Sequence, residues 1–312
     1  SGQTYIYMAI RRGPLAQPES GTEVFDVSTR NASEPAYTSG FPVDFAFARA
    51  KNIANNWDTG SRLQQGNRMF TNLTNAEATN SNMMFDYQEG WSAGTGASTD
   101  YLSWMWKRAP GFCDVVAYTG DGTYPRNIAH NLSATPEMVI IKARNWSSGN
   151  WAVHHKDLGY STVSYLDNVL GSANQPHFLT ASDASTFTVG SATSSSNYSN
   201  SASYTYIAYL FATLPGVSKV FSVTKSSGSD ASVDCGFTSG PRFVMLKRTD
   251  STGDWYVWDT ERGIVAGNDP YLLLNSTAAE VTSTDYIDPT SSGFTIVNGG
   301  LADGDYIGYA VA

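Results

Sequence analysis

A short pattern recurs along this chain at intervals close to 100 residues and constrains its fold more than any other feature. A tyrosine, an aliphatic residue and, two positions further on, a large apolar residue begin at Tyr5, Tyr101, Tyr206 and Tyr306. Successive copies lie 96, 105 and 100 residues apart. Self-similarity at a fixed period is the signature of a chain built from one repeated structural unit.

Two further markers keep the same order in each copy. Each copy holds an apolar run led by a proline and, 14 or 15 residues later, a tryptophan. The pairs are Pro42 and Trp57, Pro136 and Trp151, and Pro241 and Trp255. We therefore expect three units, at residues 22–110, 111–213 and 216–312. The structural anchors of these repeats would be Trp57, Trp151, Trp255, Tyr101, Tyr206 and Tyr306.

The composition indicates strands rather than helices. Charged residues make up only 15% of the chain, and glycine, serine, threonine and asparagine separate short apolar runs, as in strands joined by polar turns. The proline-led run is apolar without a break, which is typical of a strand covered on both faces. The first and last strands of each unit alternate, so we expect one face of each to meet solvent. Helix is expected only as one or two turns, around residues 75–79 or 278–281.

These patterns predict an all-β fold. Six to eight short strands in each unit are typical of a β-sandwich. We expect three tandem antiparallel β-sandwich repeats of about 100 residues, of the jelly-roll or lectin-like kind.

Residues 1–12 stand apart from the three units. Residues 5–10 match the closing strand of a unit whose other strands the sequence does not contain. An unpaired strand tends to pair with another chain. We expect it to complete a sheet in a neighbouring copy as a swapped strand, to pack back on this chain, or to be the remnant of a preceding unit.

The second and third units carry a family resemblance. Residues 115–122, 130–132 and 136–142, and again 243–255 and 258–262, resemble repeats in tail- and fibre-associated structural proteins of marine bacteriophages. Residues 4–9 match the strand that closes such a unit. The resemblance implies concanavalin-like lectin sandwiches, an extracellular place on the virion exterior or tail, and binding of host glycans. It supplies no catalytic residues. The first unit diverges, because Ala48-Arg49 replaces the Lys-Ala or Lys-Arg of the other two.

Charge and hydropathy restrict the partners. The net charge of −9 argues against nucleic acid, whose phosphates require a cationic face. No apolar run approaches the roughly 20 residues of a spanning helix, so we expect no membrane insertion. Cys113 and Cys235 fall at non-equivalent places in the repeat, and we predict that both are free thiols. We expect a homo-oligomer in contact with other virion proteins, because virion parts repeat by symmetry.

The histidines do not predict a metal site. His130, His154, His155 and His177 all lie in the second unit. Adjacent residues on a strand point to opposite faces, so His154 and His155 are poorly placed to share one ion. We interpret the histidines as surface residues and expect no cofactor.

Three acidic pairs stand in segments that resemble turns, where aspartate caps its own backbone. They are Asp250 with Asp254, Asp285 with Asp288, and Asp303 with Asp305. The alternatives are a surface calcium ion held by these loops and a carboxylate pair of a glycosidase. We favour turns.

Trp146 is the best candidate for contact with a ligand. It lies in the polar segment 145–150, where an exposed indole could stack on a sugar ring. We expect a non-enzymatic bacteriophage virion protein, a fibre, appendage or surface-decorating component, that adheres to host surface glycans. The alternatives are a polysaccharide-degrading enzyme, virion-borne or secreted, and a filament- or shell-forming subunit without a ligand.

Overall fold

The computed structural model describes residues 15–94, 96–190 and 198–312, and these form an all-β structure of several antiparallel sheets. Helical elements are short 3-10 turns, among them η1 (Gly21–Glu23) and η2 (Lys156–Leu158). The helix expected near residues 75–79 or 278–281 is wrong, because Ala78–Thr79 forms strand β5 and Val281 bridges Tyr271. The strand proposed for residues 5–10 lies outside the described residues.

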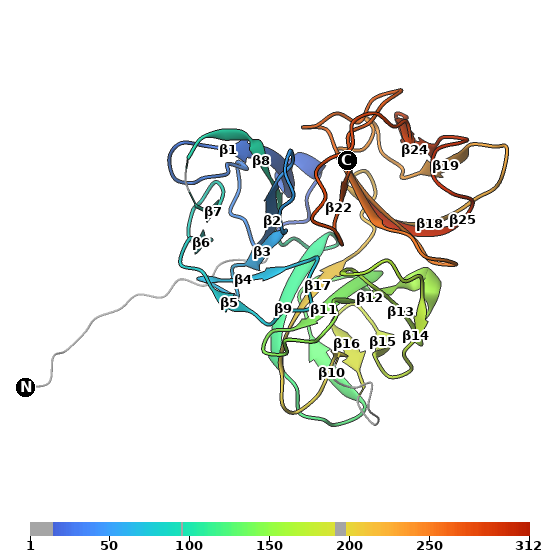
Figure 1. The fold of residues 1–312 in the computed structure, drawn as a ribbon. Coiled ribbons are helices and arrows are strands. Elements are labelled where there is room, and N and C mark those ends of the chain that lie inside the picture. Colours follow the sequence, from blue (N-terminus) through green and yellow to red (C-terminus); the bar gives the residue numbers. More distant parts are fainter. Residues whose placement is uncertain (1–14, 95, 191–197) are drawn as a thin grey trace, which may run out of the picture.

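Three large sheets, one in each third of the chain (Figure 1), share one strand order. In each, the first strand along the chain pairs with the last, and the second, third and fourth strands follow in turn. The first sheet contains β1 (Phe25–Arg30), β8 (Ser98–Trp106), β2 (Phe45–Ala50), β3 (Asp58–Ser61), β4 (Asn67–Phe70) and β5. The second contains β9 (Cys113–Thr119), β17 (Thr205–Phe211), β11 (Met138–Ala143), β12 (Ala152–His155), β13 (Thr162–Tyr165) and β14 (Ala173–Asn174). The third contains β18 (Ser218–Lys225), β25 (Gly304–Val311), β20 (Phe243–Arg248), β21 (Trp255–Asp259) and β22 (Leu272–Leu273).

A smaller sheet accompanies each large one. The smaller sheets are β6 (Met83–Met84) with β7 (Ser92–Ala93), β10 (Arg126–Ala129) with β16 (Thr186–Val189) and β15 (Leu179–Ser182), and β19 (Ala231–Asp234) with β24 (Gly293–Ile296) and β23 (Ile287–Pro289). Phe187 of β16 shares a core with Val139 and Ile141 of β11. In the same way, Phe85 packs with Ala46 of β2, and Phe294 packs with Val244 of β20. The outer face of each large sheet is therefore covered by elements of its own third of the chain.

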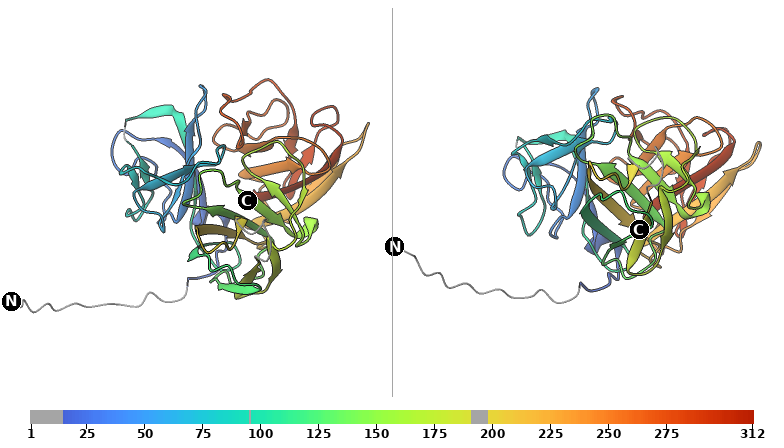
Figure 2. Two further views of the ribbon diagram at one scale, coloured as in Figure 1. Left: turned by 60° about the horizontal axis from the view of Figure 1, so that its bottom comes forward. Right: turned by 90° about the horizontal axis from the view of Figure 1, so that it is seen from below.

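The inner faces of the three large sheets meet in one central core. Alternate residues of each second strand point into it, namely Phe45 and Phe47, Met138 and Ile140, and Phe243 and Met245. The residues between them point to the outer cores. Both faces of the second strand are covered, which confirms the interpretation of its unbroken apolar run. Figure 2 shows the three sheets around this common centre.

The alternation expected for the outer strands holds only in part. The first strands β1, β9 and β18 do mix buried and partly exposed residues. The closing strands β17 and β25 are buried on both faces over most of their length, so the prediction that one face meets solvent is wrong for them. The reason is that both faces are covered, because Ile207 and Ile307 pack in the central core whereas Ala208 and Tyr306 pack in the outer cores.

Candidate functional site

The tryptophans at the repeated positions have matching surroundings in all three sheets. The backbone N–H of Trp57, Trp151 and Trp255 donates to the side chain of Asn72, Asp167 and Asn275 respectively, at 3.0, 2.8 and 2.8 Å. The same side chain is hydrogen-bonded to the residue before the tryptophan: Asn56, Asn150 or Asp254. We call these two hydrogen bonds the tryptophan bracket. They hold the start of the third strand against the end of the fourth.

The indole N–H groups of these tryptophans join one sheet to the next. Trp57 donates to the carbonyl of Leu273 in the third sheet (2.8 Å) and Trp255 to the carbonyl of Tyr165 in the second (2.8 Å). Trp151 donates to carbonyls that end the fourth strand of the first sheet, at 2.9 and 3.2 Å. The bonds close a ring. The tryptophans thus anchor the core between sheets, whereas we expected each to anchor its own sandwich.

A buried cationic side chain lies at the end of each second strand. The hydrogen bonds of these three side chains link the sheets in the same cyclic order as the tryptophan bonds. Arg49 donates to the carbonyls of residues 276–278 in the third sheet, Lys142 to Thr74 of the first and Lys247 to Asn168 of the second. Burial lowers the pKa of Arg49 to about 10 and of both lysines to about 8. Arg49 is therefore the counterpart of the lysines, and the alignment that set Ala48 against them is wrong by one residue.

The other predicted anchors lie on the closing strands. Tyr206 and Tyr306 are buried, whereas Tyr101 is only half-buried and carries the guanidinium of Arg30 3.9 Å from its ring centre. Cys113 and Cys235 are free and buried, as predicted.

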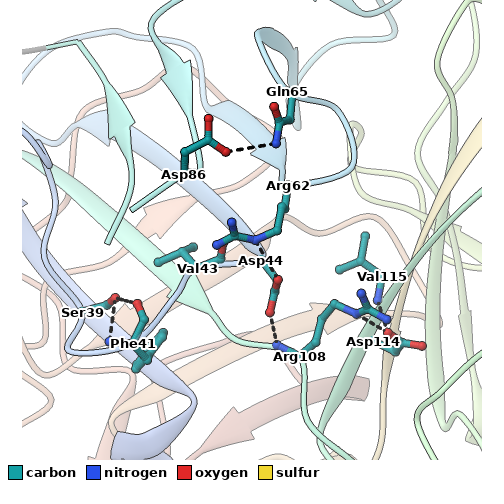
Figure 3. Close-up of polar contacts among 10 residues, drawn as sticks. All are labelled: Ser39, Phe41, Val43, Asp44, Arg62, Gln65, Asp86, Arg108, Asp114 and Val115. Carbon is teal, nitrogen blue, oxygen red and sulfur yellow. Dashed lines mark hydrogen bonds and ion pairs between the residues drawn. The ribbon is translucent and has the colours of Figure 1, made fainter. Parts of the chain in front are cut away.

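Charged residues also join the first and second sheets (Figure 3). Asp44 binds Arg62 through one carboxylate oxygen (3.1 Å) and accepts the backbone N–H of Arg108 through the other (2.8 Å). The Arg108 side chain in turn pairs with Asp114, which also accepts the N–H of Val115 (2.9 Å). These hydrogen bonds and ion pairs hold the segment between β8 and β9 in place. The charged groups therefore have a structural role.

Three of the four histidines are not surface residues, and the prediction is wrong for them, whereas His177 is partly exposed. His154 and His155 are 3% and 0% exposed, and His130 is 7% exposed. Burial lowers the pKa of both His154 and His155 to about 4, so both are neutral at pH 7. Strand β12 is covered on both faces, because Val153 packs in the central core and Ala152 in the outer core of the second sheet, and the ring of Tyr160 stacks on His154 with ring centres 5.0 Å apart. The part of the chain that is described contains no group of three or more His, Cys, Asp or Glu residues able to hold a metal ion.

Two of the six acidic residues lie in strands rather than turns. Asp288 is in β23 and Asp305 in β25. Asp250 does lie outside a strand; it pairs with Arg248 at 2.7 Å, and this bond lowers the pKa of its carboxyl. Asp254 belongs to the tryptophan bracket of the third sheet. These contacts use the carboxylates to hold backbone and neighbouring side chains.

Trp146 is half-buried and belongs to an aromatic cluster. Tyr204 stacks on its indole with ring centres 5.4 Å apart, and the ring of Tyr198 lies at 5.6 Å. The backbone of Gly149 packs against the six-membered ring of the indole, where a Cβ would come within 2.5 Å. A glycan-stacking role for Trp146 stays a prediction, but its indole already packs against protein.

Two hollows differ sharply in character. The central core holds an apolar cavity of about 20 Å³ between Phe45, Trp151, Tyr209 and Met245, among others, which is close to the volume of one water. A polar groove of about 460 Å³ lies where the second and third sheets meet. Of these two hollows, the groove is the one large enough for an organic ligand.

Comparison with known proteins gives a family without an assigned activity. A family model described as a domain of unknown function (DUF7483) matches residues 22–308. No curated protein matches the chain, and no solved structure does. No helix in the described ranges is long and apolar enough to cross a membrane.

Proposed function

The chain belongs to the DUF7483 family, and we propose that it is a structural, non-catalytic component of a bacteriophage virion, in the form of a fibre, appendage or surface-decorating protein. We further propose that its three thirds are jelly-roll β-sandwiches derived from one repeated unit. The observation that carries this proposal is the closed ring of tryptophan and cation bonds between the sheets.

A ring of this kind suits a part that must keep its shape. Each sheet both donates to one neighbour and accepts from the other, so no sheet can leave without breaking two sets of buried bonds. A buried carbonyl that loses its donor costs about 1–3 kcal/mol. The same resistance to opening is of little use to an enzyme that must close over a substrate.

The alternative is a polysaccharide-degrading enzyme, which would need a carboxylic acid of raised pKa beside a carboxylate. Burial raises the pKa of Asp269 to about 6, but this carboxylate is buried and accepts the backbone N–H groups of Val265 and Ile287, which makes its contacts structural. Asp250 has the opposite perturbation, because Arg248 lowers its pKa. The two most buried histidines are neutral and enclosed, which disfavours them as general acids or bases. Chemistry therefore supports the structural proposal over the enzymatic one.

Purified particles test the proposal. Antibodies against the chain should label intact virions at symmetric positions in electron microscopy, and quantitative mass spectrometry of gradient-purified particles should find the chain at a fixed copy number. A capsid protein serves as the positive control and a cytosolic host protein as the negative control. If the chain appears in infected-cell lysate but is lost from purified particles along with the host protein, the proposal fails. The filament- or shell-subunit alternative would instead show the chain at continuous contacts along a tube or over the whole shell.

A further inference from the structure

The groove between the second and third sheets is lined by residues of both. The second sheet and the turn after β12 contribute Asp157, Leu158 and Ser172, and the third contributes Ser222, Val223, Thr224, Thr249, Asp250, Asp305, Tyr306 and Ile307. Its volume of about 460 Å³ lies within the roughly 300–1,000 Å³ of ordinary small-ligand sites. Hydroxyl groups and carboxylates dominate the rim, and Leu158, Val223 and Ile307 add apolar surface.

We call the line along which two large sheets meet a seam. An equivalent backbone hydrogen bond crosses each of the three seams and identifies the position that corresponds to the groove. The N–H of Glu77, Ser172 and Glu280 donates to the carbonyl of Arg144, Thr249 and Lys51 respectively, at 2.6, 2.9 and 2.7 Å. Each pair joins the segment after a fourth strand to the end of the next sheet's second strand. The three seams are therefore equivalent in backbone.

Their side chains are not equivalent. At the seam of the first and second sheets, Arg144 donates twice to Glu77, at 2.6 and 2.8 Å. At the seam of the third and first sheets the residues are Glu280 and Lys51, again a long acid and a long base, although among the described residues their side chains form no ion pair. Only the seam of the second and third sheets has two short hydroxyl residues, Ser172 and Thr249. The groove lies at the seam where these positions hold small neutral side chains.

The groove has the chemistry of a saccharide site. Asp305 accepts a hydrogen bond from Thr224 (2.7 Å), while a carboxylate can accept about four. Asp157 has an exposed side chain, and Ser172, Ser222 and Thr224 can both donate and accept. Sugar hydroxyls need this mixture of acceptors and two-way partners, and their C–H faces need apolar surface. An anionic ligand would face Asp157, Asp250 and Asp305.

We propose that this groove binds a neutral oligosaccharide. The inference goes beyond a structural place in the virion, since it assigns a ligand to one seam. It also moves the expected glycan contact away from Trp146.

The neighbouring seam supplies the blocking variant. The double substitution S172E/T249R places in the groove the acid and base that fill the equivalent place between the first and second sheets. The matched control is S232E/T295R, which adds the same charges to an exposed cross-strand pair of the outer sheet, where the two hydroxyls lie 3.4 Å apart. The control should keep the unfolding midpoint of the unmodified chain. S172E/T249R also removes the hydrogen bond from the buried Thr249 hydroxyl to the carbonyl of Asp305 (3.1 Å), so S172E alone, at an exposed position, is the second blocking variant and keeps that bond.

The assay is an array of neutral gluco-, manno- and galacto-oligosaccharides, followed by calorimetric titration of the strongest binders. We expect at least one saccharide to bind the unmodified chain and the S232E/T295R control equally, within about twofold. Binding by S172E/T249R should fall at least about tenfold, the equivalent of 1.4 kcal/mol. Amide resonances of Ser172, Thr249 and Asp305 should shift on titration.

Three results would overturn the proposal. They are no binding to any saccharide on the array, binding that S172E/T249R leaves unchanged, and binding of a lysine-rich peptide in place of a sugar. The virion role is judged on particles and would survive each of these results, so failure of one proposal is distinguishable from failure of the other.

Discussion

Replacing Trp255 by phenylalanine (W255F) tests whether the bonds between sheets hold the molecule as one body. The indole N–H of Trp255 donates to the carbonyl of Tyr165 at 2.8 Å, in a buried setting. Phenylalanine keeps an aromatic ring in the central core but removes the donor. The unpaired carbonyl should cost about 1–3 kcal/mol, and the smaller ring about 1 kcal/mol more. We therefore expect the free energy of unfolding to fall by about 2–4 kcal/mol.

Two other tryptophans separate the bond from the ring. Trp258, in the same strand, and Trp106, in the same central core, are both buried, and their indole N–H groups have no hydrogen-bond partner among the described residues. W258F and W106F lose ring volume but no bond, so each should cost only about 1 kcal/mol. The difference between W255F and these controls, about 1–3 kcal/mol, measures the bond itself.

Equilibrium unfolding in urea, followed by circular dichroism and by fluorescence, provides the measurement. If the three sheets form one cooperative body, both probes report a single coincident transition, and W255F moves all of it. The reasoning is refuted if W255F costs no more than W258F and W106F. It is refuted equally if the chain unfolds in separate steps and W255F moves only one of them.

Three further outcomes are expected. Burial lowers the pKa of Lys142 to about 8, so between pH 8 and 10.5 the unfolded chain binds a proton that the folded chain does not. The free energy of unfolding of the unmodified chain should therefore rise with pH relative to that of K142M. Urea unfolding of both chains at pH 7.5 and 9.5 measures this difference. N275D places two carboxylates together at Asp254 and should lower the unfolding midpoint, whereas D254N/N275D recreates the acid–amide pair of the second sheet and should restore it. Burial raises the pKa of Cys235 to about 12 and also raises that of Cys113; neither thiol should react with a disulfide reagent at pH 8 until the chain is denatured, and rapid reaction of the folded chain would contradict their burial.

The strands could be predicted because their signal is local. Apolar runs, prolines and glycine-rich turns repeat three times, so a segment that is ambiguous in one copy is settled by the others. Phe45–Ala50 contains good helix formers, yet its counterparts contain Ile140 and Met245 and indicate a strand, which the structure confirms. The histidines were misjudged for the opposite reason, because nothing near His154 indicates that β12 is enclosed on both faces.

The contacts between sheets could not be predicted from the pattern. An unbroken apolar run indicates that both faces of a strand are covered. The same run is expected in a separate β-sandwich and in a sheet that shares a core with two others. The cations Arg49, Lys142 and Lys247 were a usable signal, since a charged residue at the end of each buried run requires acceptors nearby. Which carbonyls accept is decided by the packing of the three sheets.

The shared core also explains how one seam could diverge without loss of the whole. At each seam the bond that fixes the approach of two sheets is a backbone bond, as between Ser172 and Thr249, so it does not depend on the side chains at those positions. The buried tryptophan and cation bonds nearby carry the stability. The side chains over the backbone bond can then differ between seams, because exchanging both members of an ion pair for small hydroxyls leaves no buried charge without a partner. A groove suited to a ligand can therefore form at one seam while the backbone bonds at all three keep the sheets together.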